Sequence, residues 1–290
     1  MRGQGGLTRV LRSTVLDASN NRRFDTTNRL SQVGYLRHVT PRTNFFATGR
    51  VSVLAHRGLA HNAPENSLAA FESACAAGAD VLECDVRATK DGVAVMAHDE
   101  TLARVFGDSR RVCDVDYAEL RHIGSRPDVS VISVADALRL LPAAKFNIDV
   151  KSTDVIKPLV DAISECDAQD RVLITSFSGA RRRRTLAALP HVETSASADV
   201  VLTVVVLCAL GVPALVRWIF RRTRVLQIPT SVLKINVSSP RMIRRFHRAG
   251  FTVHFWTINS VEHMRQLARD GADGIVTDVC DVAVATFRQG

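Results

Sequence analysis

Short apolar runs alternate with helix-like segments from residue 51 onwards, and this alternation limits the possible folds more than any other feature. The runs are rich in Val, Ile and Leu, which is typical of buried strands, and the segments between them have helical composition. A strand–helix–strand order predicts a parallel sheet, because a helix must return the chain before the next strand. Strands are expected at Val51–Ala55, Val81–Ala88, Val93–Ala97, Phe146–Val150, Arg171–Phe177, His191–Ser197, Thr252–Ile258 and Gly274–Asp278.

Eight parallel strands with intervening helices predict a (β/α)₈ TIM barrel of the α/β class. A ninth apolar run, Val225–Ile228, is interpreted as part of the connection after the sixth strand. An open doubly wound sheet agrees equally well with the count, but the placement of polar residues favours the barrel. Helices are expected at Asn66–Ala77, Val134–Leu141, Asp154–Ser164 and Val261–Arg269.

Ionisable side chains lie at the ends of four consecutive predicted strands. Side chains two apart on a strand point the same way, so Glu83 and Asp85 share one face, as do Asp149 and Lys151. The carboxyl ends of barrel strands are where active sites lie. The full set is His56, Arg57, Glu83, Asp85, His98, Asp149 and Lys151.

This combination of residues suits phosphoryl transfer. Three carboxylates in one place repel each other unless a hard divalent cation such as Mg²⁺ or Ca²⁺ bridges them. Arg57 and Lys151 can hold phosphate oxygens. One histidine can accept a proton from the nucleophile while the other donates one to the leaving oxygen. A single strand-end histidine is more often structural, but the joint pattern favours a real site.

Seven motifs resemble those of the glycerophosphodiester phosphodiesterase family, which has the TIM barrel of phospholipase C-like phosphodiesterases. The resemblance covers about residues 51–285 and is specific at both ends of that range but loose between about 100 and 250. The motifs are Ala55–Gly58, Pro64–Ser67, Gly78–Val86, Thr89–Gly92, His98–Asp99, Trp256–Asn259 and Gly271–Asp278.

The resemblance implies a TIM barrel with a small insertion after the third strand, which the weakly patterned residues 99–133 fit. It also implies metal-dependent hydrolysis of glycerophosphodiesters to sn-glycerol 3-phosphate and an alcohol, by attack of water or of the substrate's 2-hydroxyl. The implied roles are His56 and His98 as the acid/base pair, Glu83, Asp85 and Asp149 as ligands of one divalent cation, Arg57 and Lys151 as phosphate contacts, Glu65 and Asn66 at the pocket wall, and Trp256 where the alcohol binds.

One residue departs from the family pattern. Asp149 stands where the family usually has Glu, whereas Asp is usual in the related sphingomyelinase D group. Because Asp is the shorter ligand, the departure bears on the choice of metal and substrate more than on catalysis.

Two other functions remain open. One is a membrane-associated phospholipase D-like enzyme that acts on lysophospholipids or sphingolipids, and the other is a non-catalytic lipid-binding barrel, against which the intact pair of histidines argues. The net charge of +9 favours anionic partners. Nucleic acid is not expected as a partner, because the chain has no recognition motif and only two Trp and two Tyr.

The first 48 residues are predicted to be a basic, disordered extension, with the barrel spanning 49–290. Residues 1–50 contain nine Arg against two acids, Asp17 and Asp25, and show no secretory h-region and no clear period. A basic tether to an anionic membrane is the alternative. Six cysteines without a CxxC pair are expected to be reduced thiols of a cytoplasmic protein.

An apolar segment at about 200–220 is the other unusual feature. Val200–Val216 contains no charged residue and is followed by Arg217. We expect a helix buried against the barrel. The alternatives are a helix pair that makes peripheral contact with a bilayer and a transmembrane helix, although a span here would split the barrel.

Overall fold

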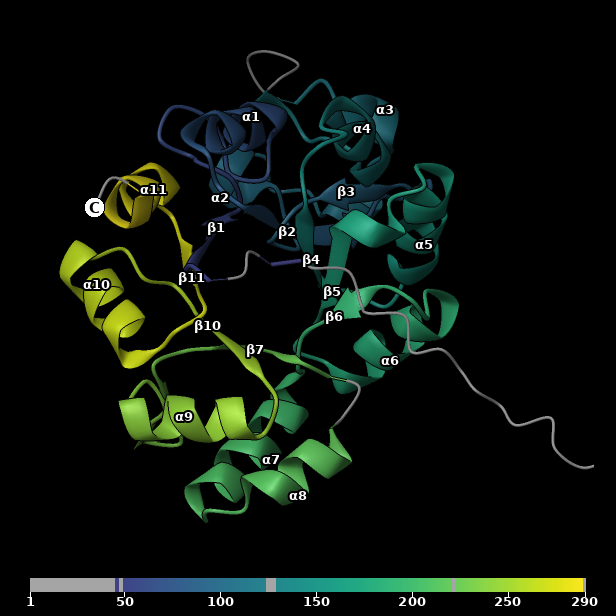
Figure 1. The fold of residues 1–290 in the computed structure, drawn as a ribbon. Coiled ribbons are helices and arrows are strands. Elements are labelled where there is room, and N and C mark those ends of the chain that lie inside the picture. The colour runs from purple at the N-terminus through teal and green to yellow at the C-terminus, as the bar shows by residue number, and fades with distance from the viewer. Residues whose placement is uncertain (1–44, 47–48, 124–128, 221–222, 289–290) are drawn as a thin grey trace, which may run out of the picture. The chain divides into compact units, whose positions relative to one another are not determined.

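Eight parallel strands form a nearly closed barrel, surrounded by helices, as Figure 1 shows. The computed structural model describes residues 45–46, 49–123, 129–220 and 223–288. Hydrogen-bonded neighbours follow the order β6-β5-β4-β2-β1-β11-β10-β7, and a bridge between Ser195 and Val225 joins the two ends of this path. The barrel strands are β1 (Ser52–His56), β2 (Val81–Ala88), β4 (Phe146–Val150), β5 (Val172–Thr175), β6 (Glu193–Thr194), β7 (Val225–Ile228), β10 (Thr252–Phe255) and β11 (Gly274–Thr277).

Helices connect successive strands and cover the outside of the barrel. All four helices predicted from the sequence are present, with ends shifted by up to two residues. The helices around the barrel are α1 (Leu68–Ala77), α4 (Val134–Leu140), α5 (Ile156–Glu165), α6 (Gly179–Ala188), α7 (Ala198–Ala209), α8 (Pro213–Ile219), α9 (Pro240–Arg248), α10 (Val261–Asp270) and α11 (Cys280–Arg288).

The barrel is confirmed, but two strand assignments were wrong. Val93–Ala97 is not a barrel strand, because β3 (Ala94–Met96) pairs antiparallel with the end of β2. Val225–Ile228 is not a connection, because it forms β7 and pairs in parallel with β10. Short apolar runs have the same composition in a hairpin and in a barrel, so periodicity alone could not separate the two cases.

The insertion follows β3, the third strand in chain order, and precedes β4. It contains α2 (Ala103–Phe106), a 3₁₀ turn (Val112–Asp114) and α3 (Tyr117–Leu120). Its apolar side chains form a small core together with Val95 of β3, which makes the insertion a structured part of the protein. That core contains Val95, Leu102, Val112, Val115, Leu120 and Val131.

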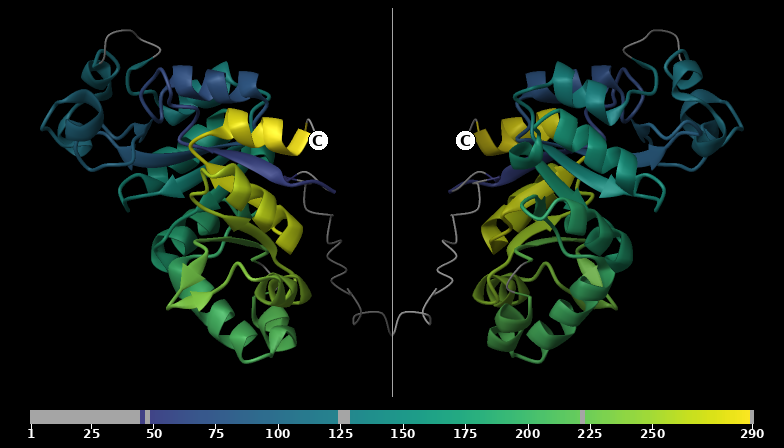
Figure 2. Two further views of the ribbon diagram at one scale, coloured as in Figure 1. Left: turned by 90° about the vertical axis from the view of Figure 1, so that its left-hand side faces the viewer. Right: turned by 90° about the vertical axis from the view of Figure 1, so that its right-hand side faces the viewer.

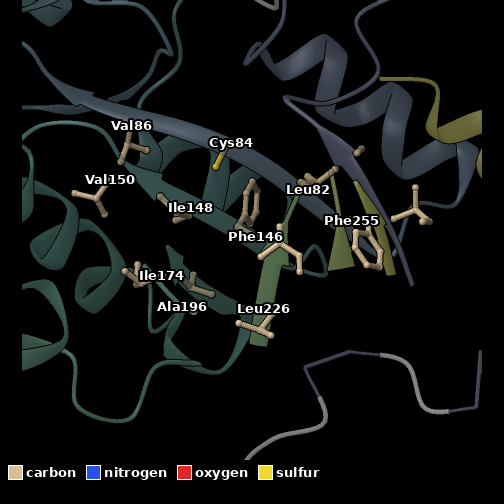
Figure 3. Packing of buried hydrophobic residues seen from close by; sticks show 14 of the residues in the cluster. Leu82, Cys84, Val86, Phe146, Ile148, Val150, Ile174, Ala196, Leu226 and Phe255 are labelled. Carbon is tan, nitrogen blue, oxygen red and sulfur yellow. The ribbon is translucent and has the colours of Figure 1, made fainter. Parts of the chain in front are cut away.

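Alternate side chains of each barrel strand build the main core. Figure 3 shows Cys84 and Val86 of β2 near Ile148 and Val150 of β4, all on the side of the strands that packs against the helices. Fully burying an apolar side chain of this size contributes about 1.5–3 kcal/mol. The intervening residues therefore point into the barrel, and this period of two brings the polar residues of β2 and β4 to the barrel interior.

The buried cysteines are free thiols. All six cysteines are unpaired, and Cys84, Cys208 and Cys280 are buried. Burial raises the pKa of Cys208 and Cys280 to about 11. These thiols therefore remain protonated near neutral pH and act as small apolar core residues.

The barrel unit includes residues that the sequence analysis assigned to the N-terminal extension. Phe45 is only 3% exposed and packs against Leu54 and other apolar residues inside the barrel. The Nζ of Lys145 donates to the carbonyl of Phe45 at 2.6 Å, and the ring of Phe46 meets His254 edge-on at 4.3 Å. The boundary at residue 48 was therefore too late. The predicted disorder of the preceding residues lies outside the described part of the chain.

The apolar segment at 200–220 forms two short helices, α7 and α8. Alpha-helices rise about 1.5 Å per residue, so the 12 residues of α7 span about 18 Å, against a hydrocarbon core of about 30 Å. Within residues 45–46, 49–123, 129–220 and 223–288, no helix is both long enough and apolar enough to cross a bilayer.

Because His254 is buried, we expect the free energy of unfolding to fall at acid pH. Burial lowers its pKa to about 4, and neither ring nitrogen has a hydrogen-bond partner among the residues that the structure describes. The unfolded chain, with a histidine pKa of about 6.5, binds the proton more readily, so the free energy of unfolding falls as the pH drops from about 6.5 to 4. The full effect is roughly 3 kcal/mol. Urea unfolding at several pH values should show this decline in the wild type and a weaker decline in His254→Leu.

His247 provides a control, because its effect on the pH dependence of stability has the opposite sign. The hydrogen bond to Asp273 raises the pKa of His247, so its contribution to stability is present at acid pH and is lost as the pH rises through the folded pKa. His247→Gln should therefore keep the acid decline due to His254. An unchanged pH dependence in His254→Leu would show that the buried ring does not cause it.

Candidate active site

A pocket of about 440 Å³ lies at the carboxyl ends of the barrel strands, and it contains all seven ionisable residues expected at strand ends. One part of its lining is polar, and another is apolar. The polar lining residues are His56, Arg57, Glu83, Asp85, His98, Asn147, Asp149, Lys151, Thr175, Ser176, Thr257 and Gln227. The apolar ones are Phe177, Ala196, Ala198, Val201, Leu202, Ile228, Pro229, Val232, Trp256 and Val276.

A tight turn after β1 places Arg57 over the pocket. Arg57 has a φ of 58° and Gly58 a φ of 85°, both in the left-handed region. A Cβ at Gly58 would lie 2.7 Å from the carbonyl carbon of Ala70 in α1, so both the backbone conformation and the close approach require glycine. The amide of Arg57 donates to Glu83 Oε2 at 3.1 Å, which fixes the turn against β2.

Three carboxylates converge at the polar end of the pocket. Glu83, Asp85 and Asp149 are 8%, 2% and 5% exposed, and Asp85 and Asp149 lie opposite each other on paired strands β2 and β4. The Nζ of Lys151 lies 2.8 Å from Asp85 and 2.7 Å from Asp149. Arg57 Nε forms an ion pair with Asp85 at 3.0 Å, without the angle of a hydrogen bond. Two cations thus offset the negative charge of the two aspartates, and neither forms an ion pair with Glu83 among the described residues.

The carboxylates differ in their affinity for protons. Burial, reinforced by the negative charges of Asp85 and Asp149, raises the pKa of Glu83 well above its usual value. Burial also works to raise the pKa of Asp85, but Lys151 and Arg57 more than offset it and lower that pKa. At Asp149 burial prevails over Lys151, and the pKa is raised. Of the three carboxyl groups, Glu83 is therefore the one whose charged form additional positive charge would stabilise most.

The carboxylates fit a hard divalent cation by their chemistry. All three supply oxygen donors, and Asp149 Oδ1 is buried and accepts no hydrogen bond from the described residues. Lys151 holds one oxygen of each aspartate, so a cation that took those oxygens would compete with its ammonium group. Throughout the described part of the chain, no three His, Cys, Asp or Glu residues are already arranged to hold a metal ion.

His56 has a carboxylate partner that the sequence analysis did not assign. Its Nδ1 lies 2.6 Å from Asp278 Oδ1, just after β11. Asn259 Nδ2 donates to Asp278 Oδ2 at 2.7 Å, and Asn259 Oδ1 accepts from the amide of Asp278. The hydrogen bond with His56 lowers the pKa of Asp278. The motifs Trp256–Asn259 and Gly271–Asp278 contained this signal, but nothing in the sequence linked them to His56.

His98 has a similar partner next to it in the chain. Its Nδ1 lies 2.7 Å from Asp99 Oδ1, and Arg104 Nε donates to the other oxygen of Asp99 at 2.6 Å. Burial works to raise the pKa of Asp99, but the hydrogen bonds with Arg104 and His98 lower it overall. Both histidines thus have Nδ1 engaged by a carboxylate. An acceptor at Nδ1 favours the tautomer that leaves Nε2 for proton transfer.

Glu65 and Asn66 lie behind the pocket wall rather than in it, which corrects their expected place. Glu65 accepts from Arg57 Nη1 at 2.9 Å and from Arg104 Nη2 at 2.6 Å, and so joins the β1 turn to the insertion. Asn66 is buried, with a φ of 58°. Its Nδ2 donates to Asp85 Oδ2 at 3.3 Å, while its Oδ1 accepts from the amide of Asp85.

The apolar wall is formed by aromatic side chains and by one face of α7. Trp256 lines the pocket as expected, and its ring meets Phe177 in a T-shaped contact at 6.0 Å. Val201 and Leu202 of α7 complete this side. Phe177, Val201 and Leu202 were missed as pocket residues, because an apolar side chain in a sequence gives no sign of facing a cavity.

Loss of the Asp278 carboxylate should impair turnover but not substrate binding. Asp278→Asn removes the charge that holds the ring of His56, so kcat should fall about 10- to 100-fold with little change in KM. Asp273→Asn is a matched control, because Asp273 also holds a histidine, His247, at the start of β11. Its kcat should stay close to that of the wild type. Equal kcat values in the two variants would contradict the role of Asp278.

Arg104 should support the site from the insertion. Arg104→Gln removes the ion pairs to Asp99 and Glu65, and kcat should fall about tenfold while the protein stays folded. Arg110→Gln is the control, since Arg110 is 45% exposed, against 50% for Arg104, and lies in the same insertion but binds Asp108 and Glu119. Steady-state kinetics with circular dichroism would test this. A similar loss of rate in both variants would indicate a general effect of the insertion.

Comparisons with known proteins agree with this geometry. Residues 56–282 match the model of the glycerophosphoryl diester phosphodiesterase family. A probable glycerophosphodiester phosphodiesterase 2 of Mycobacterium tuberculosis is 37% identical over 83% of this chain and 92% of its own length.

Solved structures share the fold. A glycerophosphodiester phosphodiesterase from Agrobacterium tumefaciens has a TM-score of 0.67 at 24% identity, covering 83% of this chain and 100% of that one. An Oleispira antarctica phosphodiesterase, solved in complex with the product sn-glycerol-3-phosphate, has a TM-score of 0.67 at 21% identity, covering 82% and 96%. From the family match and the close relative, the chain belongs to the glycerophosphoryl diester phosphodiesterase family of phosphoric diester hydrolases.

Proposed function

We propose that this protein hydrolyses glycerophosphodiesters to sn-glycerol 3-phosphate and an alcohol, with the aid of one divalent cation, Mg²⁺ or Ca²⁺. The observation that carries the proposal is one pocket with two carboxylate-bound imidazoles, two basic side chains and three buried carboxylates. The names of the relatives and the product bound to the Oleispira enzyme support the substrate.

The two basic side chains of the pocket, Arg57 and Lys151, bind the phosphate group. Arg57 offers a planar fork and Lys151 a compact charge, and both line the pocket beside the carboxylates. Their charges are held in place by Asp85, which contacts both. A phosphate anion therefore enters a site whose positive groups are already positioned, and little reorganisation is needed.

The histidines move the protons. Attack by water or by the substrate's 2-hydroxyl forms a new P–O bond as the P–O bond to the alcohol breaks. One imidazole of the pair His56 and His98 accepts the proton of the attacking oxygen, and the other donates a proton to the departing oxygen. If the 2-hydroxyl attacks, water must then open the cyclic phosphate by the same exchange of protons.

A divalent cation held by Glu83, Asp85 and Asp149 would polarise the phosphoryl group and stabilise its developing charge. The family is generally dependent on such a cation. Asp149 is one methylene shorter than the Glu usual in the family, so we expect the difference to affect the choice between Mg²⁺ and Ca²⁺. Oδ1 of Asp149, which accepts no hydrogen bond from the described residues, is the oxygen most available to the cation.

Release of sn-glycerol 3-phosphate is the direct test. Glycerophosphocholine and glycerophosphoethanolamine should be cleaved with Mg²⁺ or Ca²⁺ and left intact with a chelator. His98→Ala should reduce kcat by about 10²- to 10⁴-fold, because a positioned general acid or base contributes that much. Full activity in chelator would exclude the proposed metal dependence. Activity retained in His98→Ala would exclude the acid/base assignment.

A further inference from the structure

A row of large apolar side chains is exposed along α7 and α8. Leu210 at the end of α7 is 73% exposed, and Trp218 on α8 is 69% exposed. We call this row the α7–α8 surface. It consists of Leu202, Val206, Leu210, Leu215, Trp218 and Ile219.

The surface is held rigidly against the barrel. The opposite face of α7 buries Val204, Val205 and Cys208 in the main core. Arg245 of α9 donates to the carbonyl of Ala209 at 3.0 Å and so caps the carboxyl end of α7. Figure 1 shows α7 and α8 side by side, next to α9. The exposed side chains thus belong to a fixed structure rather than to a frayed end.

The same helix also forms the wall of the pocket. Val201 and Leu202 line the pocket, and Val206 and Leu210 extend that apolar strip along α7 to the outer surface. A second apolar tip lies near the mouth, on the hairpin of β8 (Ser231–Val232) and β9 (Ile235–Asn236), which carries exposed Leu233. Figure 2 shows this hairpin at the same end of the barrel as the insertion. The apolar surface is therefore continuous with the entrance to the active site.

The charge around this surface is mainly positive, and the one acid of α7, Asp199, lies 3.9 Å from Arg183. Residues 200–261 contain nine Lys or Arg and no Asp or Glu. Arg217 lies between the exposed side chains of α8, and Lys234 lies beside Leu233. In the part of the chain that the structure describes, neither cation has an acidic partner within ion-pair distance. An occupant that complements this region must combine an apolar interior with negative charge at its edge.

An anionic bilayer has that combination, and two other occupants do not. A second copy of this chain, docked through the same surface, would bring the cations of the two copies together, while the one acid of α7, Asp199, already lies 3.9 Å from Arg183. A nucleic acid would leave the Leu, Val and Ile side chains against phosphate and sugar. Amphipathic helices that lie in a membrane interface carry Leu and Trp on the buried face and Lys or Arg beside it.

We propose that the α7–α8 surface docks on an anionic lipid bilayer and brings the mouth of the pocket to the membrane. The apolar side chains enter the headgroup boundary, while Arg217 and Lys234 face acidic headgroups. The docking does not depend on the proposed reaction. The consequence, that phosphodiesters with one acyl chain reach the pocket from the bilayer, rests on the proposed function.

Vesicle binding tests the docking. The full chain should sediment with vesicles of phosphatidylcholine and phosphatidylglycerol, more weakly with phosphatidylcholine alone, and less at high salt. Leu210→Glu with Trp218→Glu should weaken binding at least tenfold. Leu140→Glu is the matched control, because Leu140 is 57% exposed on α4, outside the surface, and should leave binding unchanged. All variants keep the basic N-terminal residues, so equal binding by all would overturn the proposal.

Two further measurements separate docking from folding and from catalysis. In the wild type, lipids that carry a nitroxide should quench the emission of Trp218, and an absence of quenching in bound protein would overturn the proposal without any variant. All variants should cleave soluble glycerophosphocholine alike, and only the double variant should lose activity on lysophosphatidylcholine held in vesicles. Normal docking with no cleavage of either substrate would refute the proposed function alone. Reversible dimers that the double variant abolishes, without vesicle binding, would point to a second copy instead.

Discussion

Asp85 keeps a carboxylate at a position that is almost closed to solvent, and the surrounding structure is organised to make this possible. Burying an ion costs several kcal/mol unless partners compensate for the lost water. Arg57, Lys151 and Asn66 supply the compensation from three different segments of the chain. Removing one partner of such a buried pair typically destabilises a protein by about 3–5 kcal/mol.

The left-handed backbone of the β1 turn follows from the same requirement. A non-glycine residue with a positive φ costs roughly 1–3 kcal/mol, and both Arg57 and Asn66 adopt one. Each is held by contacts to β2, since the amide of Arg57 binds Glu83 and the side chain of Asn66 binds Asp85. The close approach of Gly58 to α1 then fixes the first helix of the barrel relative to the site.

The sequence predicted which side chains share a face of a strand, because this depends on the local period. It did not predict contacts between residues that are distant along the chain. The period of two placed Glu83 with Asp85, and Asp149 with Lys151, and the structure brings all four into one pocket. It could not show that Asp278 would meet His56, because 222 residues separate them and only closure of the barrel joins β1 to β11.

The pairing of strands and the exposure of side chains could not be predicted either, because both depend on segments that are distant along the chain. Nothing local in Val93–Ala97 distinguishes an antiparallel neighbour of β2 from a barrel strand. The apolar segment at 200–220 likewise does not reveal which side chains its helices bury. Val205 is fully buried, whereas Val206, the next residue, is 38% exposed. That difference arises only when α7 packs against the barrel.

Different parts of the barrel build the two ends of the pocket. The charged end is built from β1, β2 and β4, where carboxylates and cations must neutralise one another, so a change in any one residue affects the others. The opposite wall consists of Trp256, Phe177 and α7, where contacts are apolar and nearly independent. Sequence change in α7 can therefore alter the apolar wall while the charged end keeps its geometry. The helix that shapes this wall also carries the exposed apolar row, so one element belongs both to the pocket and to the proposed docking surface.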